Sequence, residues 1–341
     1  MLVPAFVDIH MHGCGGNDAG TCDIDGLTDM CRLLARHGTG AFLPTLPSVS
    51  PEVSRKALSV IDAKMKAQSE QILKDPELGG KGEKRISEAL VLGAHLEGPF
   101  MLPEYKGAHE EAVLLPATMD NWKRLTDGFE HVVKRVTIDP LCPGAMSLIP
   151  YLVDKGITVT CGHTAADSDT IMEAFRAGAT SVTHIFNAMP SIHHRRPGPA
   201  AASLADDNTY TELICDFLHV NKIVCKMVVK CKSPDKVAII TDSCEAAGMP
   251  DGTYQLSGQE IKVINGEARM EDGRLASSTV FVDIERLNLM SLGFGERDIS
   301  KLTHYTPINC ISPDITVKKY LSYLYADIGE NGLAKGLIYK K

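Results

Sequence analysis

Side chains that bind metals and carry protons recur at the ends of apolar, β-like runs of this 341-residue chain. In chain order they are His10, His12, Glu97, His163, His184 and Asp242. Imidazole nitrogens and carboxylate oxygens are ligands that divalent transition metals accept. A metal held in this way activates water, and a nearby carboxylate moves the proton. The pattern therefore indicates a metal-dependent hydrolase.

The spacing of five of these residues predicts how they share a metal site. His10 and His12 lie two residues apart on a β-like run, so both side chains point to the same face. Glu97 ends its run next to a Gly-Pro pair, where a carboxylate binds one metal ion or bridges two. His163 and His184 end successive runs, which a parallel sheet places side by side. We expect one or two divalent ions, zinc by default, with iron, manganese and cobalt as alternatives.

Two further residues are candidates for catalysis. Asp242 ends the last β-like run, and a closed barrel brings that run beside the first one, near His10 and His12. We expect Asp242 to act as a general base that accepts a proton from the attacking water and passes it to the leaving group. His109, in the segment after Glu97, is expected to reach over the pocket and polarise the substrate carbonyl.

The elements that must position these side chains alternate along the sequence. Apolar residues at i, i+3 and i+4 predict helices over 27–37, 53–73, 145–155 and 169–177, between the β-like runs. The eight runs are 6–10, 40–45, 90–97, 131–139, 157–162, 181–186, 211–216 and 236–242. Strand–helix alternation predicts a parallel sheet. Eight repeats favour a (β/α)8 TIM-type barrel, which carries its site at the C-terminal ends of the strands.

The composition excludes several function classes. A formal net charge of −8 is not expected in a protein that binds nucleic acid or an anionic membrane. We find no apolar run long enough to cross a bilayer and no basic region typical of a signal peptide at the N-terminus. The 10 cysteines form no Cys-x-x-Cys pair, so we expect reduced thiols in a cytoplasmic protein.

A cationic segment follows the His184 cluster. Residues 193–198 read His-His-Arg-Arg-Pro-Gly, and an arginine pair near a metal site predicts an anionic group on the substrate. Phosphate is favoured, because guanidinium binds it in a bidentate geometry. A solvated charged loop is the alternative. His219, which follows the seventh run, is a second candidate for substrate contact.

Six short strings, in this order along residues 4–313, resemble the N-acetylglucosamine-6-phosphate deacetylases of the amidohydrolase superfamily. They are 6–13, 95–100, 106–109, 162–165, 183–190 and 241–243. The resemblance implies removal of acetate from an N-acetylated amino sugar 6-phosphate, in amino-sugar catabolism. It implies that Glu97, His163 and His184 hold the catalytic metal. His10 and His12 match a pair found in some members only, which suggests a second ion.

The resemblance also implies a substrate site. Arg195 would hold the phosphate together with the backbone amides of Asn187 and Ala188, and His219 would contact the sugar or phosphate. Because binding residues in this family can come from a neighbouring subunit, a homodimer is implied.

The sequence departs from the family in its small β domain and in two glycines. The chain begins almost at the first barrel strand, so we expect the small β domain to be missing or reduced. Residues 1–313 are then the catalytic barrel, with a β insertion near 254–275, and 314–341 a short remnant of that domain. Phe217 and Ser277 stand where members usually have glycine, and the Phe217 ring is expected to narrow the sugar pocket.

Three alternatives stay open. The galactosamine epimer is the closest rival substrate. Cyclic-amide hydrolysis is less consistent, because many such enzymes use a bridging lysine and Glu97 occupies the comparable place here. A truncated, catalytically silent paralogue that binds only metal or sugar phosphate is the third.

Overall fold

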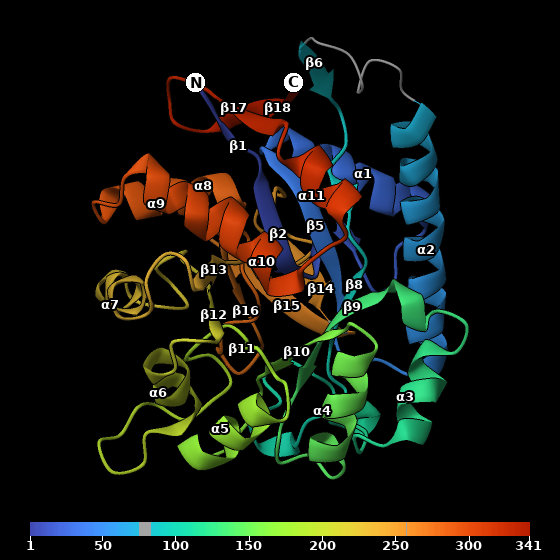
Figure 1. The fold of residues 1–341 in the computed structure, drawn as a ribbon, viewed down its shortest axis with the longest axis vertical. Helices are drawn as coiled ribbons and strands as arrows, with labels where there is room; N and C mark the ends of the chain where they lie inside the picture. The colour runs from blue at the N-terminus through green and yellow to red at the C-terminus, as the bar shows by residue number, and fades with distance from the viewer. Residues whose placement is uncertain (75–82, 257) are drawn as a thin grey trace.

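The structure, a computed structural model, describes residues 1–74, 83–256 and 258–341. Eight parallel strands form a nearly closed barrel, and each pairs with the next in chain order (Figure 1). They are β2 (Phe6–Met11), β5 (Thr39–Leu46), β8 (Ala94–Glu97), β9 (Val133–Ile138), β10 (Thr158–Cys161), β11 (Ser181–Val182), β12 (Tyr210–Leu213) and β13 (Val237–Ile239). All eight predicted strands and the barrel class are confirmed.

The barrel closes between β13 and β2 near the C-terminal ends of the two strands. The Asp242 amide donates to the His10 carbonyl at 2.9 Å, and the His12 amide donates to the Ser243 carbonyl at 2.7 Å. These bonds hold the end of the last strand against the end of the first. The predicted nearness of Asp242 to His10 and His12 is confirmed.

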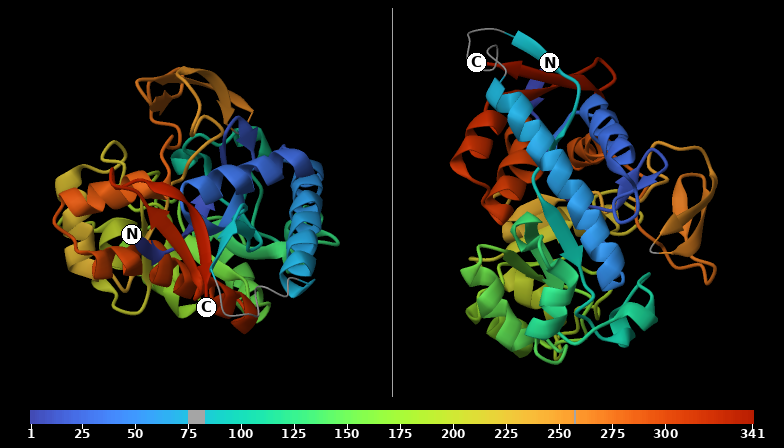
Figure 2. Two further views of the ribbon diagram at one scale, coloured as in Figure 1. Left: turned by 90° about the horizontal axis from the view of Figure 1, so that it is seen from above. Right: turned by 90° about the vertical axis from the view of Figure 1, so that its right-hand side faces the viewer.

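Helices surround the barrel (Figures 1 and 2), and the four predicted ones are present. They are α1 (Ile24–Arg36), α2 (Pro51–Lys74), α4 (Ala145–Asp154) and α5 (Ser168–Arg176). The Asp23 side chain caps α1 by accepting from the Gly26 amide, and Gly38 follows the helix at φ +77°. The other helices are α3 (Met119–Thr126), α6 (Gly198–Ala205), α7 (Lys222–Lys232), α8 (Val282–Ser291), α9 (Glu296–Ser300), α10 (Thr306–Ile311) and α11 (Ile315–Leu321). No helix in the described ranges is long and apolar enough to cross a membrane.

The strands alternate between an apolar outer face and a polar inner face. Val7 and Ile9 of β2 are buried in apolar clusters, whereas His10 points into the barrel toward β12. Inside, the Thr137 hydroxyl lies 2.8 Å from His95 Nε2 and 3.1 Å from the Thr183 hydroxyl. Since buried polar groups need partners, this interior network fixes the side chains below the strand ends.

The predicted β insertion is a three-stranded antiparallel sheet after β13. Its strands are β14 (Gly252–Leu256), β15 (Gln259–Ile264) and β16 (Glu267–Arg269). The Gln259 side chain donates to the Ala108 carbonyl, so the sheet is joined to the loop that carries His109. Three shorter strands are β3 (Gly13–Cys14), β4 (Asn17–Asp18) and β7 (Leu90–Val91).

A second antiparallel sheet lies beside the barrel, where both termini meet (Figure 1). Its order is β1 (Leu2–Pro4), β17 (Leu324–Ile328), β18 (Ala334–Lys340) and β6 (Glu83–Ile86). The residues after 316, in which the sequence shows no clear helical or strand period, contain most of α11 and both central strands. Residues 83–86 form the edge strand, and residues 75–82 lie outside the described part.

Candidate active site

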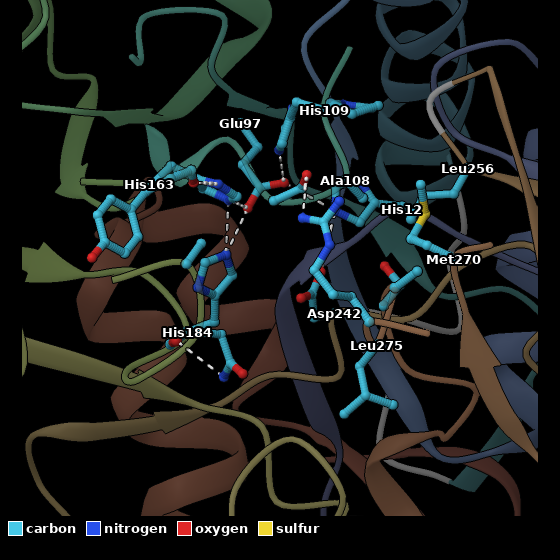
Figure 3. A pocket seen from close by; sticks show the side chains of 18 of the residues that line it. His12, Glu97, Ala108, His109, His163, His184, Asp242, Leu256, Met270 and Leu275 are labelled. Carbon is cyan, nitrogen blue, oxygen red and sulfur yellow. Dashed lines mark hydrogen bonds and ion pairs between the residues drawn. The ribbon is translucent and has the colours of Figure 1, made fainter. Parts of the chain in front are cut away.

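The six side chains predicted to bind metal or carry protons meet at the C-terminal end of the barrel, in two groups of three. Figure 3 labels all of them except His10. One group is His10, His12 and Asp242, and the other is Glu97, His163 and His184. Within each group the ligand atoms lie within 4.8 Å of one another, and every member is buried. Asp242 was predicted from the sequence as a catalytic base only, and in the structure it also lies close enough to His10 and His12 to share an ion with them.

Glu97 lies between the two groups. Its Oε1 is 3.0 Å from the Nε2 atoms of His163 and His184 and 3.2 Å from that of His10. Its Oε2 is 3.1 Å from Nε2 of His12. A carboxylate that faces both groups occupies the place of a bridging ligand.

Hydrogen bonds orient the imidazoles. Nδ1 of His12 lies 3.1 Å from the Thr45 carbonyl, and Nδ1 of His163 lies 3.0 Å from the Tyr105 carbonyl. A carbonyl only accepts, so each Nδ1 carries a proton and each Nε2 faces the site, where the neutral form of the ring can bind a metal. Metal-binding histidines show the same arrangement, with the outer nitrogen donating to an acceptor.

Two features of the histidine nitrogens are better explained by a bound cation than by hydrogen bonds among buried polar groups. Nε2 of His10 is buried and makes no hydrogen bond to the described residues. Nε2 of His163 lies only 3.1 Å from Nε2 of His184. Two nitrogen lone pairs at that distance repel each other unless a proton or a metal ion lies between them. The residues present therefore fit a divalent metal.

The electrostatics favour positive charge between these groups. Burial alone would raise the pKa of Glu97, but His10 and His163 hold it well below its usual value. The pKa of Asp242 is lowered to about 2, because His10 and His12 outweigh burial. Burial opposes charge on His12, yet its contacts with Asp242 and Glu97 raise its pKa to about 9. Two ionised carboxylates buried at this depth require nearby positive charge, which protonated imidazoles or a bound cation can supply.

Backbone strain concentrates at the same residues. His163, His184 and Asp242 have φ values of +50°, +24° and +49°, in the left-handed region that non-glycine residues avoid. Each such residue costs about 1–2 kcal/mol. Gly162, directly before His163, has no room for a side chain, because a Cβ there would lie 2.7 Å from Cβ of Thr183. The strand ends thus give up stability to aim their side chains inward.

His109 is a neutral hydrogen-bond donor. Its Nδ1 accepts from the Ser48 amide at 3.0 Å, so the proton is on Nε2, which lies 3.3 Å from Oε2 of Glu97. Burial, followed by the nearby His163, lowers the pKa of His109 to about 4 despite the opposing effect of Glu97. At neutral pH the ring therefore offers one N–H to the cavity.

A cavity of about 330 Å³ opens above the two groups. Asn187, Ala188, His109 and His219 line it, as expected of substrate-binding residues. His219 is fixed by Asp216, whose carboxylate lies 2.7 Å from Nδ1. The insertion sheet and the segment after it supply another wall, through Leu256, Met270 and residues 274–277.

Arg195 does not line this cavity. It lies on an exposed loop, and its guanidinium contacts the neighbouring His194. The arginine that does line the cavity is Arg274, which is paired with Asp272 and donates to the Gly107 carbonyl at 3.3 Å. Arg274 was not predicted from the sequence, although the Asp-Gly pair immediately before it indicates a turn there.

Phe217 and Ser277 both occupy left-handed backbone positions, at φ +69° and +65°. Glycine adopts this conformation without steric cost, which agrees with the glycine that family members usually have at these two positions. Ser277 lines the cavity, whereas Phe217 packs against the main core and is not among the lining residues. The expectation that the Phe217 ring narrows the sugar pocket is corrected by this placement.

Sequence and structure comparisons identify similar proteins. The chain is 35% identical to the N-acetylgalactosamine-6-phosphate deacetylase of Escherichia coli O157:H7 over 292 residues, 86% of this chain and 73% of that protein. It is 35% identical to the N-acetylglucosamine-6-phosphate deacetylase of Bacillus subtilis over 278 residues, 82% of this chain and 67% of that protein.

A solved structure gives the same result. The structure of a mutant N-acetyl-D-glucosamine-6-phosphate deacetylase from Mycobacterium smegmatis, in complex with its substrate, aligns with a TM-score of 0.85 and 27% identity. The alignment covers 98% of this chain and 84% of that one. No protein-family model matches the chain.

Proposed function

Because this chain belongs to the N-acetylglucosamine-6-phosphate deacetylase family of the amidohydrolase superfamily, we propose that it hydrolyses the acetamide of N-acetylglucosamine 6-phosphate. The products are glucosamine 6-phosphate and acetate, as in amino-sugar catabolism. One observation carries the proposal: two groups of side chains that could bind a metal ion lie at the floor of one cavity. Asp242 belongs to one of these groups and also lines the cavity.

The two groups support an assignment of the metal ligands. Glu97, His163 and His184 would hold the catalytic ion, and His10 and His12, with Asp242 beside them, would hold a second one. Zinc is the expected ion, because histidine and carboxylate ligands are typical of its sites. A divalent ion in this place supplies a Lewis acid that acidifies water and polarises an amide carbonyl.

The chain's own residues move the proton and stabilise the developing charge. Asp242 is ionised at neutral pH, so it accepts the proton of the attacking water and then delivers it to the amide nitrogen. His109 donates its Nε2 proton in a hydrogen bond to the carbonyl oxygen as negative charge develops there. The buried floor keeps both groups in place before substrate arrives.

Substrate binding involves a second subunit in this proposal. Arg195 is exposed and lies outside its own cavity, which is the expected position of a residue that holds the phosphate in a partner's site. Asn187 and Ala188 offer backbone amides to the phosphate, and His219 contacts the sugar. Exposed apolar side chains on the two neighbouring β/α units favour self-association as a homodimer. They are Ile192, Leu218, Ile223 and Met227.

Two further assignments, of the domains and of the cellular location, complete the proposal. Residues 1–313 contain the catalytic barrel, and 314–341 supply β17 and β18 of a remnant of the small β domain, to which β1 and β6 also contribute. A cytoplasmic location is supported by the 10 cysteines, all of which are free thiols.

The galactosamine epimer is the second candidate substrate, because the Escherichia coli relative at 35% identity carries that name. Acetate release from the two N-acetylhexosamine 6-phosphates and from unphosphorylated N-acetylglucosamine separates the readings. We expect the gluco 6-phosphate to give the highest kcat/KM and the unphosphorylated sugar the lowest. Metal-loaded protein that releases acetate from neither phosphate would contradict the proposal and favour a silent, metal-binding paralogue.

A further inference from the structure

A buried ion pair lies inside the barrel, directly below the metal-competent groups. Arg135 of β9 and Glu212 of β12 are both fully buried, and Nη2 of Arg135 lies 2.6 Å from Oε1 of Glu212. The same nitrogen donates to the Ser181 hydroxyl at 2.9 Å. Burying two charges carries a large desolvation cost, and hydrophobic replacements are often at least as stable. The pair therefore calls for an explanation beyond packing.

The second oxygen of Glu212 contacts both groups. Oε2 lies 3.1 Å from Nδ1 of His10 and accepts the backbone amide of His184 at 3.2 Å. The first contact orients a side chain of one group, and the second holds the main chain of a residue of the other. The His184 backbone is strained, at φ +24°, so this acceptor stabilises a conformation that the chain otherwise avoids.

The acceptor for His10 differs from those of its neighbours. His12 and His163 donate Nδ1–H to main-chain carbonyls, whereas His10 donates to a carboxylate held by an arginine. A carboxylate fixes the tautomer and makes the ring a stronger ligand at Nε2. Nε2 of His10 faces Glu97 and Asp242 at 3.2 and 3.4 Å.

We propose that Glu212 and Arg135 are positioning residues that hold His10 in its metal-binding orientation, and that they determine whether the ion at His10, His12 and Asp242 is retained. This inference rests on the proposed function, because it assumes the second ion. It assigns a role to two residues that touch neither substrate nor metal.

Zinc binding tests the inference without any need for turnover. Glu212→Gln keeps the shape of the side chain and removes its charge. In a chelator competition with Zn²⁺ alone, we expect the zinc content of this variant to fall from two ions to one per chain. The chelator concentration needed should be at least about 10-fold lower than for the wild-type protein. Glu285→Gln is the matched control, since Glu285 is fully buried but lies on α8 outside both groups.

A second variant keeps the test decisive if the unpaired Arg135 prevents folding. Arg135→Met/Glu212→Gln removes both charges, and the thermal unfolding transition reports whether it folds. Weakened binding of one zinc ion in the folded double variant supports the inference, and wild-type affinity for both ions overturns it. Absence of acetate release by the wild-type protein would contradict the proposed function instead, so the two failures are distinguishable.

Discussion

The metal end of the cavity is built from strand ends, whereas the end that would receive the phosphate is built from loops. At the metal end, the exposed fraction of a side chain reaches no more than 12%, at Asp242, and several contacts fix each side chain. At the other end, Arg195 is exposed on a loop and Arg274 is 57% exposed. Under the proposed function, the barrel would fix the bond-breaking chemistry, while the loops, together with a second subunit, would select the substrate.

The largest expected effect is at the metal end. Asp242→Asn removes the proton carrier without changing its size, so kcat for N-acetylglucosamine 6-phosphate should fall by roughly 10²–10⁴-fold. Steady-state kinetics at saturating zinc measures this, with the zinc content determined on the same sample. An unchanged kcat in a fully loaded variant would remove Asp242 from the mechanism.

An intermediate effect is expected at the loop end. Arg195→Ala should raise KM for the 6-phosphate by roughly 10–100-fold, because a hydrogen bond to a charged group contributes about 1.5–3 kcal/mol. The unphosphorylated sugar should respond little. Arg196→Ala, next to it and also exposed, should have a smaller effect. Equal changes in KM for both sugars would contradict the assignment of Arg195 to the phosphate.

A mixing experiment sharpens the same comparison. If Arg195 acts in the partner's cavity, a mixture of Asp242→Asn and Arg195→Ala proteins that exchange subunits should be more active than either alone. One cavity of the mixed dimer then has both an intact aspartate and an intact arginine. No gain after subunit exchange would contradict the proposal that Arg195 acts in the partner's cavity.

The smallest effect is expected at Ser277. Ser277→Gly relieves a left-handed backbone and should raise the free energy of unfolding by up to about 1 kcal/mol, with a modest change in KM because the residue lines the cavity. Ser312→Gly, also left-handed but far along the chain at the end of α10, is the control for stability alone. Chemical denaturation and kinetics check both. A stability loss in Ser277→Gly would contradict the strain argument.

The metal end could be predicted from the sequence because its side chains all lie at the ends of predicted strands. Each of its residues follows an apolar run, and parallel strands in a barrel bring such ends together. Glu212 and Arg135 were missed, since their pairing crosses the barrel interior and no single run reveals it. Both residues lie in predicted strands, 211–216 and 131–139, but these strands also contain Asp216 and Lys134, so the local pattern does not single out the charge that faces the barrel interior.

The loop end and the tail were predicted less well for a different reason. Arg274 reaches the cavity through a turn whose direction is set by the packing of the insertion sheet against the His109 loop. In the tail, the alternation of buried Leu324, Ala326 and Ile328 is short, and β17 pairs with β1 from the opposite end of the chain. Such long-range pairing leaves little local pattern.

The central claim is that this chain is a metal-dependent deacetylase whose metal site lies at the buried end of the cavity. The most direct test measures acetate release from N-acetylglucosamine 6-phosphate and metal content on one purified sample, before and after chelation and after zinc is returned. We predict turnover that disappears with the metal and recovers with zinc. Turnover that persists after the metal has been removed would contradict the account.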